Sequence, residues 1–192
     1  MQTDDRGLIV VDDRFRTTAD GIYAAGDVIG PPALASVSME QGRVAACYAF
    51  GIPFKDTVDP LPPYGVYSIP EAAMVGMTAD AASQQGIAAE VGRGFFEYSP
   101  RAQIMGATEG LIKLVFRRDD RRLLGVHIAG EIAGELIHVG QAALSCNERI
   151  DTFIHRTFNV PTFCETYKYA AYDGLERLSG RQPLRFPGQG DE

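Results

Sequence analysis

The chain has little cysteine and no long apolar run. Its three cysteines, Cys47, Cys146 and Cys164, are far apart and form no CxxC pair, so the sequence supports neither a zinc site nor a disulfide framework. No stretch approaches the roughly 20 apolar residues that a membrane span needs, and the start MQTDDRG lacks both parts of a signal peptide. We expect a cytoplasmic protein without a metal or a membrane partner.

Basic residues are also in the minority. The chain has 18 Lys and Arg against 25 Asp and Glu, which gives a formal net charge of −7, and the basic residues form no stripe. Electrostatic binding of phosphates requires such a stripe, so we do not expect the chain to bind nucleic acid.

The first 60 residues alternate between short extended patterns and one helical pattern. Residues 8–11 and 22–25 are apolar and predict two short strands around a turn at residues 17–21. Small and apolar residues then recur at near-helical spacing over residues 33–51, and Gly51 is a suitable helix end. The pattern predicts two strands followed by a helix.

A cluster of prolines at residues 59–63 marks a boundary, because prolines at three of four positions forbid both helix and central strand. The patterns beyond it predict an α+β unit that begins near Tyr64, with its sheet first and its helices after. The expected elements are strands at 66–69 and 90–97, a short helix from Thr78 to Gly86, a hairpin of 111–116 and 123–128, and helices at 131–145 and 163–178.

The segment Thr17–Asp27, TTADGIYAAGD, resembles the second flavin motif of the flavoprotein reductases that carry two dinucleotide folds. The continuation from Leu34 to Ala46 is similar to the helix that this family aims at the flavin pyrimidine. A helix N-terminus carries unpaired N–H groups and partial positive charge, which suits reduced flavin. The resemblance implies that Gly26, Asp27, Leu34 and Ala35 contact FAD, with Asp27 on the ribitol and the Ala35 backbone facing the ring.

The segments 67–76, 125–128 and 135–138 resemble the dimerisation domain of the same family. Several motifs in order, spread over residues 5 to 178, make this resemblance stronger than any one motif. It implies a C-terminal remnant of an FAD-binding α/β domain over residues 1–60, then a dimerisation domain with an antiparallel sheet and helices over 61–178, and a loose tail over 179–192. We expect a homodimer, because the apolar stripes of the two long helices offer more surface than one small sheet can cover.

The loop FNVPTFCE, residues 158–165, departs from the family pattern. Where the disulfide reductases of the family carry an acid/base histidine, this chain has Val160, although the glutamate that orients the histidine remains as Glu165. Valine cannot transfer protons, so thiol chemistry would lose its base. The alternative is that Val160 is simply packed in the core.

This departure, with the segment Arg101–Gly106, resembles the soluble pyridine nucleotide transhydrogenases of the family. Those enzymes need only hydride steps, from NADPH to FAD and from the flavin to NAD⁺, and no catalytic histidine. Two other readings stay open: a fragment of a disulfide reductase such as dihydrolipoamide dehydrogenase, and a purely non-catalytic dimerisation module. No GxGxxG follows a strand, so half of the flavin site is missing and the chain alone is expected to be inactive.

The remaining candidates are weaker. His127, His138 and His155 lie in strand or helix patterns and are expected to be structural histidines with satisfied ring nitrogens. Cys164 has no histidine near it in sequence, so a packed, unreactive thiol is expected.

Overall fold

The computed structural model describes residues 1–180, and the chain divides into two compact units, Met1–Pro62 and Pro63–Glu192. The proline cluster at residues 59–63 contains the point of division. From residue 181 onward, the tail expected over residues 179–192 lies outside the described residues.

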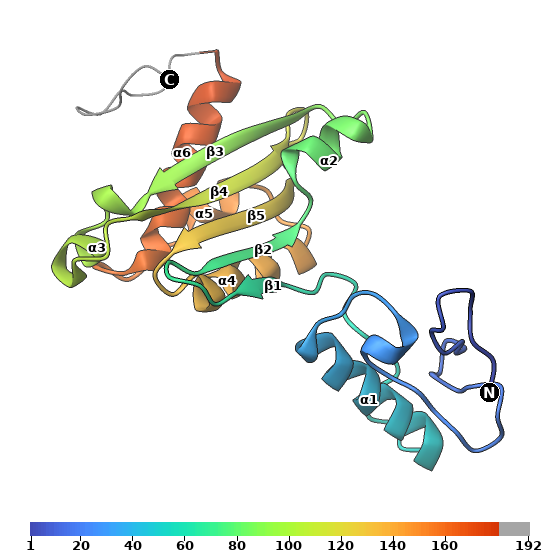
Figure 1. The fold of residues 1–192 in the computed structure, drawn as a ribbon. Helices are drawn as coiled ribbons and strands as arrows, with labels where there is room; N and C mark the ends of the chain where they lie inside the picture. The colour runs from blue at the N-terminus through green and yellow to red at the C-terminus, as the bar shows by residue number, and fades with distance from the viewer. Residues whose placement is uncertain (181–192) are drawn as a thin grey trace. The chain divides into compact units, whose positions relative to one another are not determined.

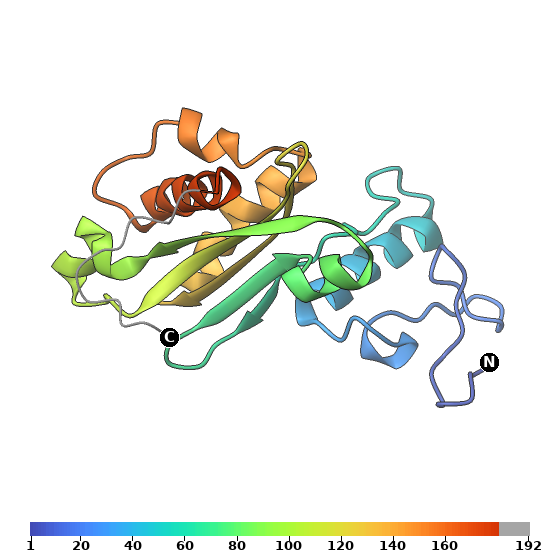
Figure 2. The ribbon, with the colours of Figure 1, turned by 90° about the horizontal axis from the view of Figure 1, so that it is seen from above.

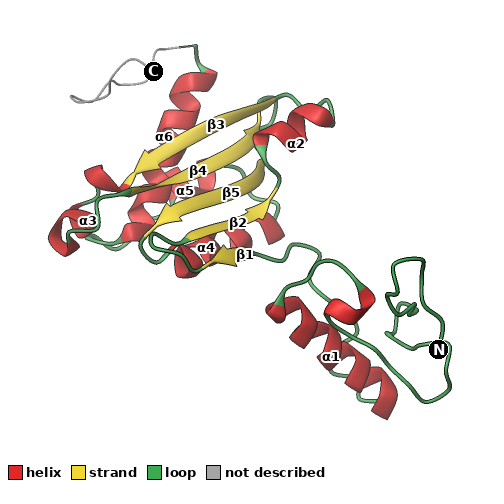
Figure 3. Ribbon diagram, viewed as in Figure 1, coloured by secondary structure: helices red, strands yellow, loops and turns green. Residues whose placement is uncertain are grey.

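The first unit has one long helix and is otherwise built mainly of loops and turns (Figure 3). Helix α1 spans Ala35–Phe50 and ends at Gly51, which has a left-handed φ of 62° and donates its N–H to the Cys47 carbonyl. The helix predicted at residues 33–51 is confirmed. A short 3-10 helix, η1, covers Asp27–Ile29.

The two strands predicted in the first unit are wrong. Residues 8–11 and 22–25 take part only in isolated bridges, which pair Thr3 with Ile9, Val11 with Thr17, and Arg16 with Tyr23. An apolar alternating pattern predicts an extended chain, but a strand also needs a neighbour that runs beside it for several residues. Within residues 1–62 the structure supplies no such neighbour.

The second unit is built on a five-stranded sheet in the order β1-β2-β5-β4-β3, in which every neighbouring pair is antiparallel (Figure 1). This confirms the predicted fold class and hairpin. The predicted strand at 66–69 is wrong, because the chain bends at residues 68–70, where the Ser68 hydroxyl donates to the Pro70 carbonyl. The strands are β1 Tyr64–Val66, β2 Ala72–Gly76, β3 Ala89–Phe95, β4 Gly110–Arg117 and β5 Leu123–Gly130.

Helices α4 and α6 lie on one face of this sheet (Figure 2). α4, Ala133–Ser145, packs on β2 and β5, whereas α6, Thr166–Leu178, packs on β3 and β4. The Thr78 side chain accepts a bond from the Ala81 N–H at 3.0 Å and caps α2, as predicted. The shorter helices are α2 Ala79–Gln84, η2 Phe96–Tyr98, α3 Pro100–Met105, α5 Asp151–His155 and η3 Phe163–Glu165.

Glycines let α6 approach the sheet closely. A Cβ atom at Gly92 would lie 2.1 Å from the Ala170 carbonyl oxygen, and one at Gly94 would lie 2.5 Å from the Thr166 carbonyl oxygen. Helix and strand backbones therefore touch here, and any side chain at either glycine would force them apart.

The sheet covers the apolar stripes of the two long helices. Leu136 and Ala143 of α4, and Tyr167 and Ala171 of α6, are buried within the unit. The expectation that one small sheet cannot cover these stripes is therefore wrong for these residues. The outer face of α6 instead exposes two tyrosines, Tyr169 (41%) and Tyr172 (48%).

Candidate functional site

The Gly26–Asp27 turn is tied to helix α1. The Gly26 N–H donates to Oε1 of Gln41 at 2.7 Å, and Gln41 is only 8% exposed. Gly26 has a φ of 84°, and a Cβ there would lie 3.1 Å from the Ser38 hydroxyl oxygen. Glycine is thus required at this turn both for its backbone angle and for its lack of a side chain.

The Asp27 carboxylate is exposed beside the start of α1. The Ser38 hydroxyl oxygen lies 3.4 Å from Asp27 Oδ1 and 3.0 Å from the Leu34 carbonyl oxygen, so it links the turn to the helix start. The N-cap residue Leu34 gives no side-chain hydrogen bond, which leaves the N–H groups of the first turn, from Ala35 onward, as free donors.

All four residues that the sequence assigned to this site therefore lie in one neighbourhood, where an acceptor carboxylate and backbone donors meet. Sequence reasoning missed the structural roles of Ser38 and Gln41. Their spacing of three on one helix, with both side chains polar, was the available signal.

The side chain at position 160 is exposed and cannot transfer a proton. Val160 is 70% exposed, so the alternative that it packs in the core is wrong. Glu165, in η3, is 5% exposed, and its Oε1 accepts the Tyr169 hydroxyl at 2.9 Å, which raises the pKa of Tyr169. Its Oε2 is buried without a partner among residues 1–180. Tyr169, four residues along the chain from Glu165, was not identified from the sequence.

Two of the histidines, His127 and His138, differ in their hydrogen bonding. Both ring nitrogens of His127, on β5, are buried and have no hydrogen-bond partner in the described part of the chain, so the prediction of a satisfied histidine is wrong there. Burial, together with the charge of Lys113, lowers the His127 pKa to about 4. The neighbours of His127 across the sheet are Met74, whose thioether is only a weak acceptor, and Lys113, whose ammonium group accepts no hydrogen bond. His138 Nδ1 instead lies 2.9 Å from Gln141 Oε1.

The three cysteines, all within residues 1–180, form no disulfide with one another. All three are free, and burial raises the pKa of the half-buried Cys164, which favours the neutral thiol. Within residues 1–180, no group of three or more His, Cys, Asp and Glu residues could hold a metal ion. No helix in that part of the chain is long and apolar enough to cross a membrane.

Two protein-family profiles match the chain, one in each unit. The profile of the pyridine nucleotide-disulphide oxidoreductase dimerisation domain matches residues 62–171, and that of the pyridine nucleotide-disulphide oxidoreductases matches residues 1–42. The chain belongs to the pyridine nucleotide-disulphide oxidoreductase family.

Among curated members of this family, soluble pyridine nucleotide transhydrogenases are similar to the chain. That of Mycobacterium bovis (strain BCG / Pasteur 1173P2) is 45% identical over 96% of this chain and 39% of its own length. That of Marinomonas sp. (strain MWYL1) is 40% identical over 93% of this chain and 39% of its own length. The chain thus spans about two fifths of these relatives.

Solved structures of the family share the fold. The HOCl-induced flavoprotein disulfide reductase RclA from Escherichia coli superposes with a TM-score of 0.81 at 27% identity, over 89% of this chain and 40% of that one. LpdA from Mycobacterium tuberculosis gives a TM-score of 0.73 at 29% identity, over 86% and 36%. The observed antiparallel sheet with helices is therefore that of flavoprotein reductases.

Proposed function

We propose that this chain is the C-terminal portion of an FAD-dependent oxidoreductase that transfers hydride between NADPH and NAD⁺. The observation that carries the proposal is the exposed Val160 in the loop before Glu165. Transhydrogenases at 40–45% identity support it independently.

The first unit would supply the ribitol and ring end of the flavin site. The Asp27 carboxylate is exposed and can accept hydrogen bonds from ribitol hydroxyls, and the uncapped first turn of α1 at Ala35 can donate to the oxygens of the flavin pyrimidine. Gly26, which has no Cβ, lets Ser38 pack against the turn and so keeps Asp27 beside the start of α1. The donors and acceptors present thus fit FAD, which when bound would accept and return the hydride.

The Val160 loop favours nicotinamide exchange over disulfide reduction. Reduction of a disulfide releases thiolates that need a proton donor, whereas hydride exchange between nicotinamides needs none. Here the exposed position carries an alkyl side chain, and Glu165 is engaged by a tyrosine instead of a histidine. A disulfide reductase remains the second candidate, because RclA, which shares the fold, bears that name.

The two units would have different roles in the parent enzyme. Residues 1–60 would complete an FAD-binding domain, and residues 61–178 would dimerise as in the family whose dimerisation domain they match. The exposed Val160, Tyr169 and Tyr172 are suited to a subunit interface, where tyrosine is enriched. The three free cysteines are consistent with a cytoplasmic enzyme.

The test uses the longer parent protein, assayed for NADPH-dependent reduction of an NAD⁺ analogue beside lipoamide and glutathione disulfide. Val160→Ala should cost little activity, because valine has no proton to give. Asp27→Ala should weaken FAD retention by about 1–3 kcal/mol, the usual cost of unpaired hydrogen-bonding groups. Asp20→Ala, which removes another exposed aspartate of the first unit, is the matched control. Disulfide turnover faster than nicotinamide exchange would reject the proposal.

The chain alone gives a second test. It should purify without yellow colour and should not oxidise NAD(P)H, because it carries only part of the flavin site. Light scattering should report a dimer at micromolar concentrations. Stoichiometric FAD in the purified chain, or a monomer, would contradict the division of roles between the two units.

A further inference from the structure

Strand β3 is an edge of the sheet, since the order β1-β2-β5-β4-β3 leaves it with one neighbour. The Ala88 carbonyl accepts the Arg118 N–H at 2.9 Å, so even-numbered residues at this edge bond to β4. Antiparallel pairing alternates, and the N–H groups of Val91 and Arg93 therefore point away from the sheet. The odd-numbered residues of this seven-residue strand therefore turn their backbone groups outward, and such an edge is a template to which another strand could add.

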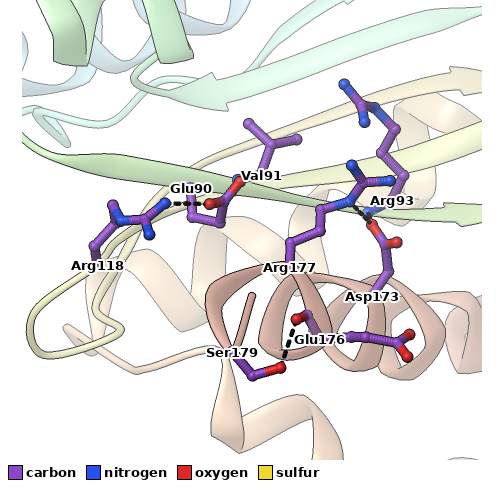
Figure 4. Close-up of polar contacts among 8 residues, drawn as sticks. All are labelled: Glu90, Val91, Arg93, Arg118, Asp173, Glu176, Arg177 and Ser179. Atoms are coloured by element: carbon purple, nitrogen blue, oxygen red, sulfur yellow. Dashed lines mark hydrogen bonds and ion pairs between the residues drawn. The ribbon is translucent and has the colours of Figure 1, made fainter. Parts of the chain in front are cut away.

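A carboxylate from α6 accepts a hydrogen bond from one of the two middle outward N–H groups. The Arg93 N–H donates to Asp173 Oδ2 at 2.8 Å, and Arg177 Nε donates to the same oxygen at 2.8 Å (Figure 4). The close approach of α6 over Gly92 brings Asp173 within reach of the strand. Asp173 thus sits where the carbonyl of an added strand would have to lie.

A second carboxylate occupies the neighbouring donor. The Val91 N–H donates to Glu90 Oε1 at 3.0 Å, and the other oxygen of Glu90 pairs with Arg118 Nη1. Figure 4 shows both carboxylates beside β3, each with its own arginine. Each carboxylate is held in place by its ion pair with an arginine. The carboxylate side chain therefore gains less conformational freedom when it leaves the strand.

We propose that Glu90 and Asp173, held by Arg118 and Arg177, close the β3 edge against a second copy of this chain. The outward N–H groups of Val91 and Arg93, in the middle of the strand, are already satisfied by side chains, so a β3–β3 ladder would have to displace two charge-assisted hydrogen bonds. The opposite edge, β1, has only three residues and offers little to pair. These two carboxylates direct self-association to surfaces other than the β3 edge. This role is independent of the proposed hydride chemistry.

The test compares variants of the full chain by sedimentation and by amide hydrogen exchange. Glu90→Ala/Asp173→Ala should form concentration-dependent assemblies larger than the unmodified chain does. In dilute solution the Arg93 amide of Asp173→Ala should exchange roughly 10- to 100-fold faster, as loss of a charge-assisted hydrogen bond implies. Asp173→Asn keeps an acceptor oxygen but loses the charge, so its Arg93 amide should exchange faster than in the unmodified chain and more slowly than in Asp173→Ala. Asp119→Ala, at the exposed hairpin tip, controls for the loss of one charge.

A probe peptide makes the test independent of variant stability. The sequence of β4, GLIKLVFR, is a strand that pairs with β3 in the native sheet. Added to the unmodified chain, it should leave the Val91 and Arg93 amide signals unchanged. A shift of those signals in the unmodified chain would overturn the proposal. So would an Asp173→Ala chain that folds, keeps its size at every concentration and retains slow exchange at Arg93.

Discussion

The two units differ in how completely each buries its apolar residues. In the second unit the sheet and helices remove Phe116, Leu114 and Tyr167 entirely from solvent. In the first unit a single helix buries Val44, while Phe50 and Phe54 at its C-terminal side stay about four-fifths exposed at 79% and 83%. A folded core needs elements on both sides of an apolar layer, and only the second unit has them.

This difference shows that two units of one chain can differ in their ability to fold alone. The second unit has the layered core of a domain that can fold alone. The first unit, with one helix and isolated bridges, presents apolar side chains that further polypeptide could cover. Four experiments test this contrast.

The largest effect is expected from core truncation. Phe116→Ala should destabilise the second unit by about 3–5 kcal/mol, because the ring is fully buried and contacts Gly174 of α6. Phe54→Ala, at an exposed position of the first unit, should change stability by less than about 0.5 kcal/mol. Urea unfolding followed by far-UV circular dichroism measures both. An equal loss in the two variants would show that the contrast in burial does not govern stability.

A comparison of two glycines comes next. Gly92→Ala should cost about 3 kcal/mol, because the new Cβ meets the Ala170 carbonyl of α6 at 2.1 Å. Gly42→Ala, inside α1 with no atom within 4 Å of the new Cβ, should stabilise that helix by about 0.5–1 kcal/mol. Segment-resolved hydrogen exchange separates the two units. A neutral Gly92→Ala would mean that α6 can move away from β3 without loss.

The pH dependence of the second unit should trace to His127. Its pKa falls from the usual 6.5 to about 4 on folding, so the native state favours the neutral ring. Stability from this source is present above pH 6.5 and is lost as the pH falls from 6.5 through about 4. Because His127 as a whole is only partly buried, solvent screening limits the loss to about 1–2 kcal/mol.

Two variants check this assignment. His127→Gln should flatten the pH profile of urea unfolding between pH 6.5 and 4. Lys113→Gln should raise the His127 pKa seen in an NMR titration, because it removes the neighbouring charge. An His127 pKa near 6.5 in the unmodified chain would contradict both expectations.

The smallest effect concerns helix capping. Thr78→Ala should destabilise α2 by about 1 kcal/mol, because the Ala81 N–H loses its acceptor, whereas Thr78→Ser keeps the hydroxyl and should cost little. The loss should appear as faster amide exchange in α2 alone. Thr78 makes no capping bond to helix α1, whose N-cap residue Leu34 gives no side-chain hydrogen bond, so amide exchange in α1 should not change.

Local signals in the sequence predicted much of the second unit. The charged tip between two apolar runs identified the β4–β5 hairpin, Thr78 identified the start of α2, and helical spacing identified α4 and α6. These features depend on neighbours in sequence, which is why they could be read without coordinates. The strands expected at residues 8–11 and 22–25 failed because they required partners that sequence alone does not supply.

For the candidate site, the sequence by itself determined the residue types: a glycine and a carboxylate before a helix, and a valine where a proton carrier would be needed. Only the tertiary structure decided which side chains join them. It joined Gly26 to Gln41, exposed Val160 and gave Glu165 a tyrosine partner. It also left His127 without a hydrogen-bond partner among residues 1–180. The reason is physical, because hydrogen-bond partners and burial depend on distances between segments that pattern and spacing along the chain do not fix.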